Sequence, residues 1–363
     1  MKEKRNYTLE FWRFIFSILI CLFHFEKMYR GSEATHAYFA TGFISVEFFF
    51  ILAGFFIAQA REQRMDPFTI ETAARQGLSF VKKKFEKIFF RFALVTFLLI
   101  IFVYGTSITD IAKRIMNLEW DLLFLQNTSL GRGDSPIGVM WFVSSLVITG
   151  YFTVVALYWQ KNATKYLLAP IAWLLGYSYF GFQASSLATN MQQFGILSSG
   201  TIRGFAGLGL GISTFYLYQH IIRKEVTKKS KILFNIIEWY VLFRIFFLIF
   251  EQPANKESFR LLFYFPVLII LSYSKITLLS KILDTKFSKY LGKISLVIFL
   301  IHPGVIRLYI RYSPEVNRFK VDLLVYLCIV VLLAVLTELG FSYLPPIVRA
   351  KCKSIRQHRK NKT

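Results

Sequence analysis

Long apolar stretches recur along the whole chain, and they restrict its fold more than any other feature. Ten stretches approach the roughly 20 residues that a helix needs to cross a hydrocarbon core of about 30 Å. They cover residues 9–28, 38–60, 88–107, 137–159, 166–183, 199–221, 232–251, 259–275, 290–310 and 321–345. The sequence therefore predicts an all-α, polytopic membrane protein with about ten transmembrane helices.

The composition excludes the main alternatives. Hydrophobic residues make up 55% of the chain and aromatic residues 18%, with 40 Phe, which neither a water-soluble core nor a disordered chain would contain. The net charge of +23 does not indicate a nucleic-acid partner, because Lys and Arg lie in short clusters between the apolar stretches. The three cysteines are scattered, so we expect neither a disulfide framework nor a metal site.

The distribution of cations predicts how the chain is oriented in the membrane. Lys and Arg are concentrated at the N-terminus, in 61–87, 160–165, 222–231 and 275–289, and in the tail from Arg349, whereas the alternate loops hold fewer. By the positive-inside rule both termini should be cytoplasmic, which requires an even number of spans. We expect one transmembrane domain over residues 1–345 and a basic cytoplasmic tail over 346–363.

Ionisable residues inside an apolar helix are costly, so those of the first span are candidate functional residues. Glu10, Arg13, Ser17, Cys21 and His24 follow one another at steps of three or four and lie along one helix face. Arg13 and His24 are about 16 Å apart along the axis, so they cannot pair with each other. This face should present a cation near the cytoplasm and an imidazole farther out. Alternatively, Arg13 extends to the interface and His24 is a buried structural residue.

The second and sixth spans also carry ionisable residues. Glu47 in the second span has three possible roles: to pair with Arg13, to orient an imidazole, or to form a buried ion pair that fixes helix register. Arg203 begins the sixth span, and we expect it to face outward or to line a cavity. Gly207 and Gly211 in the same span have the spacing of closely packed helices.

The ninth span contains SLVIFLIHPGVI, with Ser295 and His302 on one helix face. Pro303 should kink the helix just after the histidine. Three roles are open for His302: a second base, a proton relay, or a residue that orients groups on the outer side of the membrane.

A basic segment, VKKKFEKIFFRF, precedes the third span and includes Lys84 and Lys87. Two interpretations are open. The cations bind the phosphates of a cytoplasmic anionic ligand, or they are attracted to anionic lipid at the membrane surface.

Together these elements resemble the integral-membrane acyltransferase family 3, which includes bacterial polysaccharide O-acetyltransferases. FWRFIFSILICLFHF is similar to the opening element of that family, an Arg beside aromatic residues followed by a His. SVEFFFILAGFF, WFVSSL, IRGFAGLGLGI and LGKISLVIFLIHPGV resemble further family elements in the same order. The chain departs from the family at Ala53, where a serine is usual, and at Lys84 and Lys87, which replace two arginines.

The resemblance implies an O-acyltransferase in the bacterial cytoplasmic membrane. It would move an acetyl or other short acyl group from cytoplasmic acyl-CoA, with acetyl-CoA as the expected donor, to a hydroxyl of an extracytoplasmic or lipid-linked glycan. The resemblance also implies that His24 is the general base, a role that suits imidazole near neutral pH. The candidate residues are His24, Glu47 and His302 for catalysis, Arg13, Lys84 and Lys87 for the donor, and Trp141, Arg203 and Ser295 for the acceptor.

Two other classes of function fit the same spans. A proton-coupled transporter would use Arg13, His24 and Glu47 as a buried relay, although the halves of the sequence show no duplication. A non-catalytic membrane component of a glycan-export assembly is the other. Binding of acyl-CoA, together with a need for His24 in turnover, distinguishes the enzyme from both.

Overall fold

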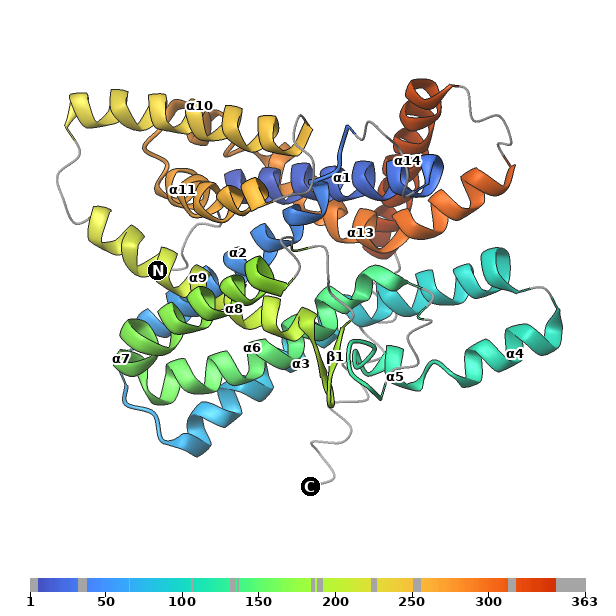
Figure 1. Ribbon diagram of the computed structural model, residues 1–363, viewed down its shortest axis with the longest axis horizontal. Coiled ribbons are helices and arrows are strands. Elements are labelled where there is room, and N and C mark those ends of the chain that lie inside the picture. The colour runs from blue at the N-terminus through green and yellow to red at the C-terminus, as the bar shows by residue number, and fades with distance from the viewer. Residues whose placement is uncertain are drawn as a thin grey trace.

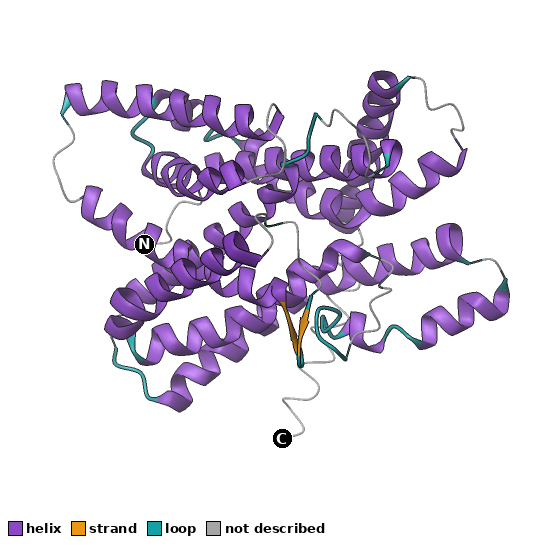
Figure 2. Ribbon diagram, viewed as in Figure 1, coloured by secondary structure: helices purple, strands orange, loops and turns teal. Residues whose placement is uncertain are grey.

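The computed structural model describes residues 6–31, 38–64, 66–105, 107–130, 135, 137–183, 187, 192–222, 227–250, 256–312 and 318–343. Nearly all of this part of the chain is helical (Figures 1 and 2). Its two strands, β1 (Gln193–Phe194) and β2 (Leu197–Ser198), form a small antiparallel hairpin. The predicted all-α fold is therefore confirmed. The tail predicted over 346–363 lies outside the described residues.

A helix occupies each of the ten apolar stretches. The corresponding helices are α1 (Tyr7–Arg30), α2 (Ser45–Glu62), α3 (Ile70–Leu99), α6 (Trp141–Trp159), α8 (Ala169–Gln183), α9 (Ser199–Ile222), α10 (Lys228–Phe250), α11 (Leu261–Ser274), α13 (Lys286–Tyr312) and α14 (Phe319–Tyr343). In the described part of the chain, seven helices are long and apolar enough to cross a membrane, which makes this a multi-pass membrane protein. The basic segment before the third stretch is not a loop, because α3 begins at Ile70 and continues through it.

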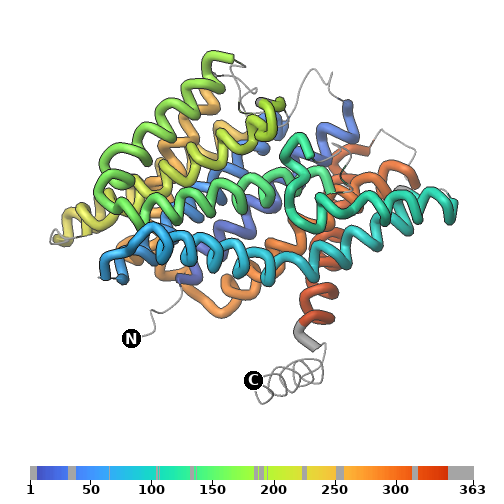
Figure 3. The backbone as a smooth tube through the Cα atoms, turned by 90° about the horizontal axis from the view of Figure 1, so that it is seen from below, coloured from blue at the N-terminus to red at the C-terminus, as the bar shows by residue number. Residues whose placement is uncertain are grey.

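Short helical segments connect these elements. They are η1 (Gly42–Ile44), η2 (Ile100–Tyr104), α4 (Ile108–Met116), α5 (Glu119–Leu122), η3 (Gly138–Met140), α7 (Lys161–Ala163), η4 (Thr164–Leu168), η5 (Lys256–Arg260) and α12 (Leu278–Ile282). Two of them, η2 and η4, are π-helical turns. Seen from below, α3 runs beside α6 (Figure 3).

Helices α2 and α9 approach closely because glycines line their contact. Gly54 lies against the backbone of Leu208, and Gly211 lies against the backbone of α2, so an added side chain at either glycine would overlap main-chain atoms. Gly207 receives the side chain of Phe50 in the same way. The close packing predicted from Gly207 and Gly211 is confirmed.

Helices α1, α13 and α14 form a second group, in which α13 packs against both of the others (Figure 1). A polar contact and an aromatic stack hold their ends together. Tyr29 of α1 and Tyr309 of α13 both donate hydrogen bonds to Asp322 of α14, the latter at 2.7 Å. Phe25 stacks between Tyr29 and Tyr326, with ring centroids 5.1 and 4.6 Å away. This group fixes the position of α13 relative to α1.

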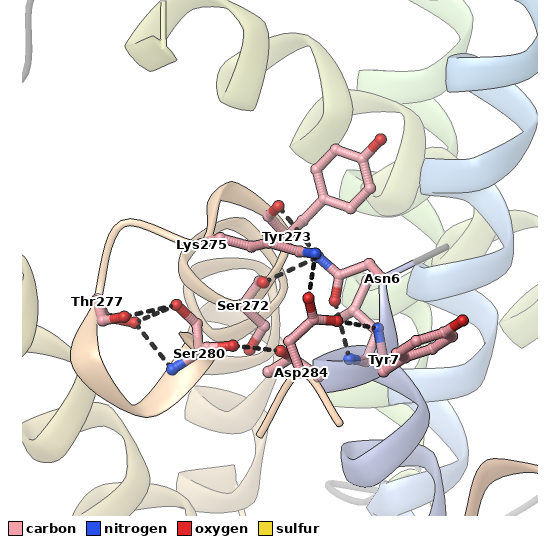
Figure 4. Close-up of polar contacts among 10 residues, drawn as sticks. Asn6, Tyr7, Ser272, Tyr273, Lys275, Thr277, Ser280 and Asp284 are labelled. Atoms are coloured by element: carbon pink, nitrogen blue, oxygen red, sulfur yellow. Dashed lines mark hydrogen bonds and ion pairs between the residues drawn. The ribbon is translucent and has the colours of Figure 1, made fainter. Parts of the chain in front are cut away.

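The start of α1 is fixed to the last turn of α11 and to the segment between α11 and α13 (Figure 4). The Asn6 amide donates to the carbonyl oxygens of Ser272 and Tyr273, each at 3.1 Å. The Asp284 carboxylate accepts a hydrogen bond of 2.9 Å from the backbone N–H of Tyr7. These bonds satisfy N-terminal groups that a helix leaves unpaired, and they hold the first turn of α1 in place.

Candidate functional site

A cavity of about 390 Å³ lies among α1, α2, α3, α6 and α13. Its lining includes all three cations predicted to bind an acyl donor, Arg13, Lys84 and Lys87. Apolar side chains cover most of the remaining wall, among them Phe49, Leu52, Phe142, Leu146 and Phe299. The structure therefore places cations from two distant segments of the sequence around one largely apolar cavity, which we call the cationic cavity.

Arg13 is held by a neighbour on its own helix. Its Nη1 donates to Oε2 of Glu10, one turn earlier, at 2.6 Å. Glu10 in turn packs against Gly292 of α13, where any side chain would overlap it. In the described part of the chain Glu10 is the one hydrogen-bond partner of the Arg13 guanidinium, so most of its five N–H donors are left for a ligand.

Lys84 faces Arg13 from α3, and the two positive charges repel one another. Burial, with the Arg13 charge as a second cause, lowers the pKa of Lys84 to about 8. The Lys84 ammonium group lies 5.2 Å from the centre of the Phe80 ring. Phosphate groups bound in the cationic cavity would relieve this repulsion.

His24 and His302 lie next to each other across the contact between α1 and α13. Their ring centroids are 5.3 Å apart, and the ring planes differ by 37°. Nδ1 of the fully buried His302 is 3.1 Å from the carbonyl oxygen of Ile298. Because a carbonyl oxygen only accepts, this bond assigns the proton to Nδ1 and makes Nε2 an acceptor. Nε2 has no hydrogen-bond partner among the described residues.

The cationic cavity extends toward these histidines. Ser17 and Ser295 line it, and they occupy the same helix faces as His24 and His302, respectively. Phe299, another lining residue, has its ring centroid 6.1 Å from that of His302. Arg13 and the pair of histidines therefore lie at successive levels along α1.

Glu47 forms a buried ion pair with Arg203 of α9. Arg203 Nε donates to Glu47 Oε1 at 2.6 Å, and Tyr177 Oη donates to Glu47 Oε2 at 2.7 Å. Of the three roles left open by the sequence, the buried pair between helices is the one observed. The other two possibilities, a contact of Glu47 with Arg13 or with an imidazole, are not realised, because Tyr177 and Arg203 bind its carboxylate.

Trp141 and Arg203 belong to this ion-pair network. The Arg203 guanidinium lies 4.7 Å from the centre of the Trp141 ring, and both side chains are buried. The expectation that Arg203 faces outward or lines a cavity is wrong, because it is buried in its pair with Glu47. Neither residue lines the cationic cavity, whereas Ser295, the third residue expected to bind the acceptor, does. The Ser295 hydroxyl donates to the carbonyl oxygen of Gly292 at 2.9 Å.

Sequence reasoning missed three residues that shape these sites. Nothing in the sequence set Tyr177 apart from the other polar residues of the apolar stretch 166–183. Tyr273 lies near the end of the apolar stretch 259–275, where a tyrosine is common. In the structure Tyr273 lines the cationic cavity and accepts a hydrogen bond of 2.5 Å from Gln59. Gly292 stood in the LGKIS element, and a glycine at that position was the one available sign of a close helix contact.

The ionisable groups described here suit an anionic ligand. Within the described residues, no three His, Cys, Asp or Glu side chains are close enough together to hold a metal ion. The cationic cavity has three cations and one carboxylate, Glu10, on its wall. Charge-assisted hydrogen bonds from Arg and Lys are the usual means of holding phosphate.

Comparison with known proteins assigns a family. A family model described as an acyltransferase domain matches residues 6–342, which is nearly the whole chain and includes every candidate residue named above. Searches of curated proteins and of solved structures gave no significant match.

Proposed function

Since the chain belongs to acyltransferase family 3 and is a multi-pass membrane protein, we propose that it is an O-acyltransferase of the bacterial cytoplasmic membrane. In this proposal the donor is cytoplasmic acyl-CoA, with acetyl-CoA preferred. The acceptor is a hydroxyl of an extracytoplasmic or lipid-linked glycan, and His24 is the general base.

The observation that carries the proposal is that α1 contributes both to the cationic cavity, through Arg13, and to the histidine pair, through His24. Coenzyme A carries its phosphates at one end and the acyl thioester at the end of a long flexible arm. Arg13, Lys84 and Lys87 would hold the phosphates. The arm would then follow the apolar wall past Ser17 and bring the thioester carbonyl toward His24.

His24 would start the reaction by taking the proton of the acceptor hydroxyl. The oxygen attacks the thioester carbonyl, and the tetrahedral intermediate collapses by breaking the carbon–sulfur bond. The coenzyme A thiolate leaves and takes up the proton from the His24 imidazolium. Atoms and charges balance, and the products are the acyl ester and free coenzyme A.

His302 would be a positioning residue for His24. Its Nε2 is an unpartnered acceptor beside the His24 ring, so it can receive the N–H of His24 and keep the other His24 nitrogen basic. The bond to Ile298 fixes the His302 ring for this task. The role resembles that of the group that orients histidine in hydrolase triads.

The transporter alternative requires a continuous relay through Arg13, His24 and Glu47. The structure pairs Arg13 with Glu10 and Glu47 with Arg203. Because Arg13 is about 16 Å from His24 along α1, these contacts favour separate binding and reaction regions over one relay.

Inverted membrane vesicles that contain the protein test the proposal. They would be supplied with radiolabelled acetyl-CoA, and label in base-labile ester of endogenous glycan or glycolipid would be measured. We expect incorporation with the native protein and with His220→Ala, which changes an exposed histidine, but none with His24→Ala. Full incorporation by folded His24→Ala protein would reject the base. No incorporation by the native protein with any acyl donor would reject the enzyme.

A further inference from the structure

A second group of cations lies at the end of α2, outside the cationic cavity. It consists of Arg61, Arg64, Lys161 and Lys165, contributed by α2, the residues just after it, α7 and η4. We call it the Arg61 cluster. The Glu62 carboxylate pairs with Lys161 at 2.7 Å, and Asp66 follows Arg64 in the sequence. The group keeps a positive excess, and none of its cations lines the cationic cavity.

Aromatic rings hold these cations in place without neutralising them. The Arg61 guanidinium lies 4.9 Å from the Phe68 ring centre and 5.6 Å from that of Tyr158. Nζ of Lys165 lies 4.4 Å from the ring centres of both Tyr166 and Tyr216. Cation–π contacts restrict the side chains and leave their charge available to an anion.

Two buried polar atoms in this region have no partner among the described residues. Arg61, only 7% exposed, donates through Nη1 to the carbonyl oxygen of Arg64 at 2.7 Å, but its Nε has no acceptor. The Oγ1 of Thr164, in a side chain 3% exposed, is also unpartnered. Buried polar atoms are normally hydrogen-bonded, so these two have capacity for a further partner. Thr164 begins η4, and π-helical turns are frequent at functional sites.

Exposed apolar side chains adjoin the Arg61 cluster. Trp159, Leu167 and Leu168 project from the same segment as Lys161 and Lys165, and all three are about half exposed. Cations beside an exposed apolar surface match a molecule that has a phosphate headgroup and hydrocarbon chains. A small soluble anion needs only the cations.

We propose that the Arg61 cluster binds the phosphate of an anionic phospholipid, whose chains lie against Trp159, Leu167 and Leu168. Arg64 and Lys165 contact the headgroup directly, and the buried Arg61 adds positive charge behind them and binds the Arg64 carbonyl oxygen. The predicted orientation places this site at the cytoplasmic leaflet, where anionic lipid is available. The proposal does not depend on the acyltransferase reaction.

Titration of the purified full-length protein in neutral detergent tests this site, with bound lipid counted by native mass spectrometry. The probes are phosphatidylglycerol, phosphatidylcholine, inorganic phosphate and acetyl-CoA. The test variant is Arg64→Gln with Lys165→Gln. The matched control is Lys228→Gln with Lys229→Gln, which removes the same charge from two exposed residues at the start of α10.

We expect phosphatidylglycerol to bind native and control proteins within twofold of each other, and the test variant to bind it roughly tenfold more weakly or worse. Phosphatidylcholine should bind all three proteins weakly. Equal weakening in test and control variants would overturn the site in favour of general charge attraction. Displacement of the lipid by inorganic phosphate or by acetyl-CoA would overturn the lipid assignment in favour of a soluble ligand. If the double variant does not fold, Lys165→Gln alone replaces it, with Lys229→Gln as control.

Discussion

Gly292 of α13 lies directly against the side chain of Glu10 on α1, so the lack of a side chain at Gly292 sets where Glu10 can sit. Glu10 in turn binds Arg13, the cation that reaches into the cationic cavity from α1. A glycine on α13 therefore controls the geometry of a charged site on α1.

Replacing Gly292 by Ala should weaken acetyl-CoA binding about fivefold or more, because the new methyl group displaces Glu10 and with it Arg13. Overpacking of this kind typically costs about 1–3 kcal/mol. Calorimetric titration of the purified protein with acetyl-CoA measures the effect. Gly340→Ala is the matched control, since Gly340 also lies in a helix but has open space around its Cα. Equal affinity in the two variants would show that Glu10 does not set the donor site.

Replacing Arg13 by Gln should reduce acetyl-CoA affinity by about ten- to a hundredfold, since hydrogen bonds to charged groups contribute about 1.5–3 kcal/mol. Arg13→Lys should recover part of the loss, because lysine keeps the charge but not the planar fork. The Glu10→Gln, Arg13→Gln double variant separates lost attraction from the unpaired Glu10 carboxylate. If the double variant binds acetyl-CoA as tightly as the native protein, Arg13 does not contact the donor.

Acetyl-CoA affinity should fall as the pH rises above about 8. The lowered pKa of Lys84 means that this lysine is charged below pH 8 and loses its proton above it. The charged form attracts phosphate and the neutral form does not, so affinity is highest on the acid side of the transition. Lys84→Arg stays charged throughout this range, and its affinity should not change. Dissociation constants measured from about pH 6.5 to 9.5 test this, and an identical decline in Lys84→Arg would assign it to another group.

Replacing Glu47 by Gln should destabilise the protein while leaving acetyl-CoA affinity of the folded fraction unchanged. The buried Arg203 would lose its counter-charge, and breaking such a pair costs about 3–5 kcal/mol. The Glu47→Gln, Arg203→Met double variant should be more stable than Glu47→Gln alone, because no lone charge remains buried. Thermal unfolding in detergent compares the three proteins. Native stability of Glu47→Gln combined with lost turnover would instead support a catalytic Glu47.

The helices could be predicted because their signal is local. An apolar run of membrane length specifies a helix whatever it packs against, and the structure has a helix in each such run. The Arg13–Glu10 pair also follows from spacing along one helix face. Seven helices satisfy length and composition, three fewer than the ten apolar runs. Of the other three, α3 carries charges, α8 is short, and α9 is rich in glycine and polar residues.

Contacts between helices could not be predicted in the same way. Glu47 finds its partner 156 residues away, and nothing near it in the sequence favours Arg203 over Arg13 or a histidine. The close contact between α2 and α9, which glycines allow, brings Arg203 to Glu47 and so determines which cation pairs with this carboxylate. The adjacency of His24 and His302 depends likewise on how α13 lies beside α1.

The helix α1 is unbroken from Tyr7 to Arg30, so it cannot shorten between Arg13 and His24. In the proposed reaction it therefore fixes a distance of about 16 Å between the cation that binds phosphate and the histidine that acts as base. A donor must be long enough to place its phosphates at Arg13 and its acyl carbonyl at His24. Selectivity would then rest on the length of the carrier and not on the acyl group, so that acetyl phosphate is too short to serve while different short acyl chains on coenzyme A are accepted.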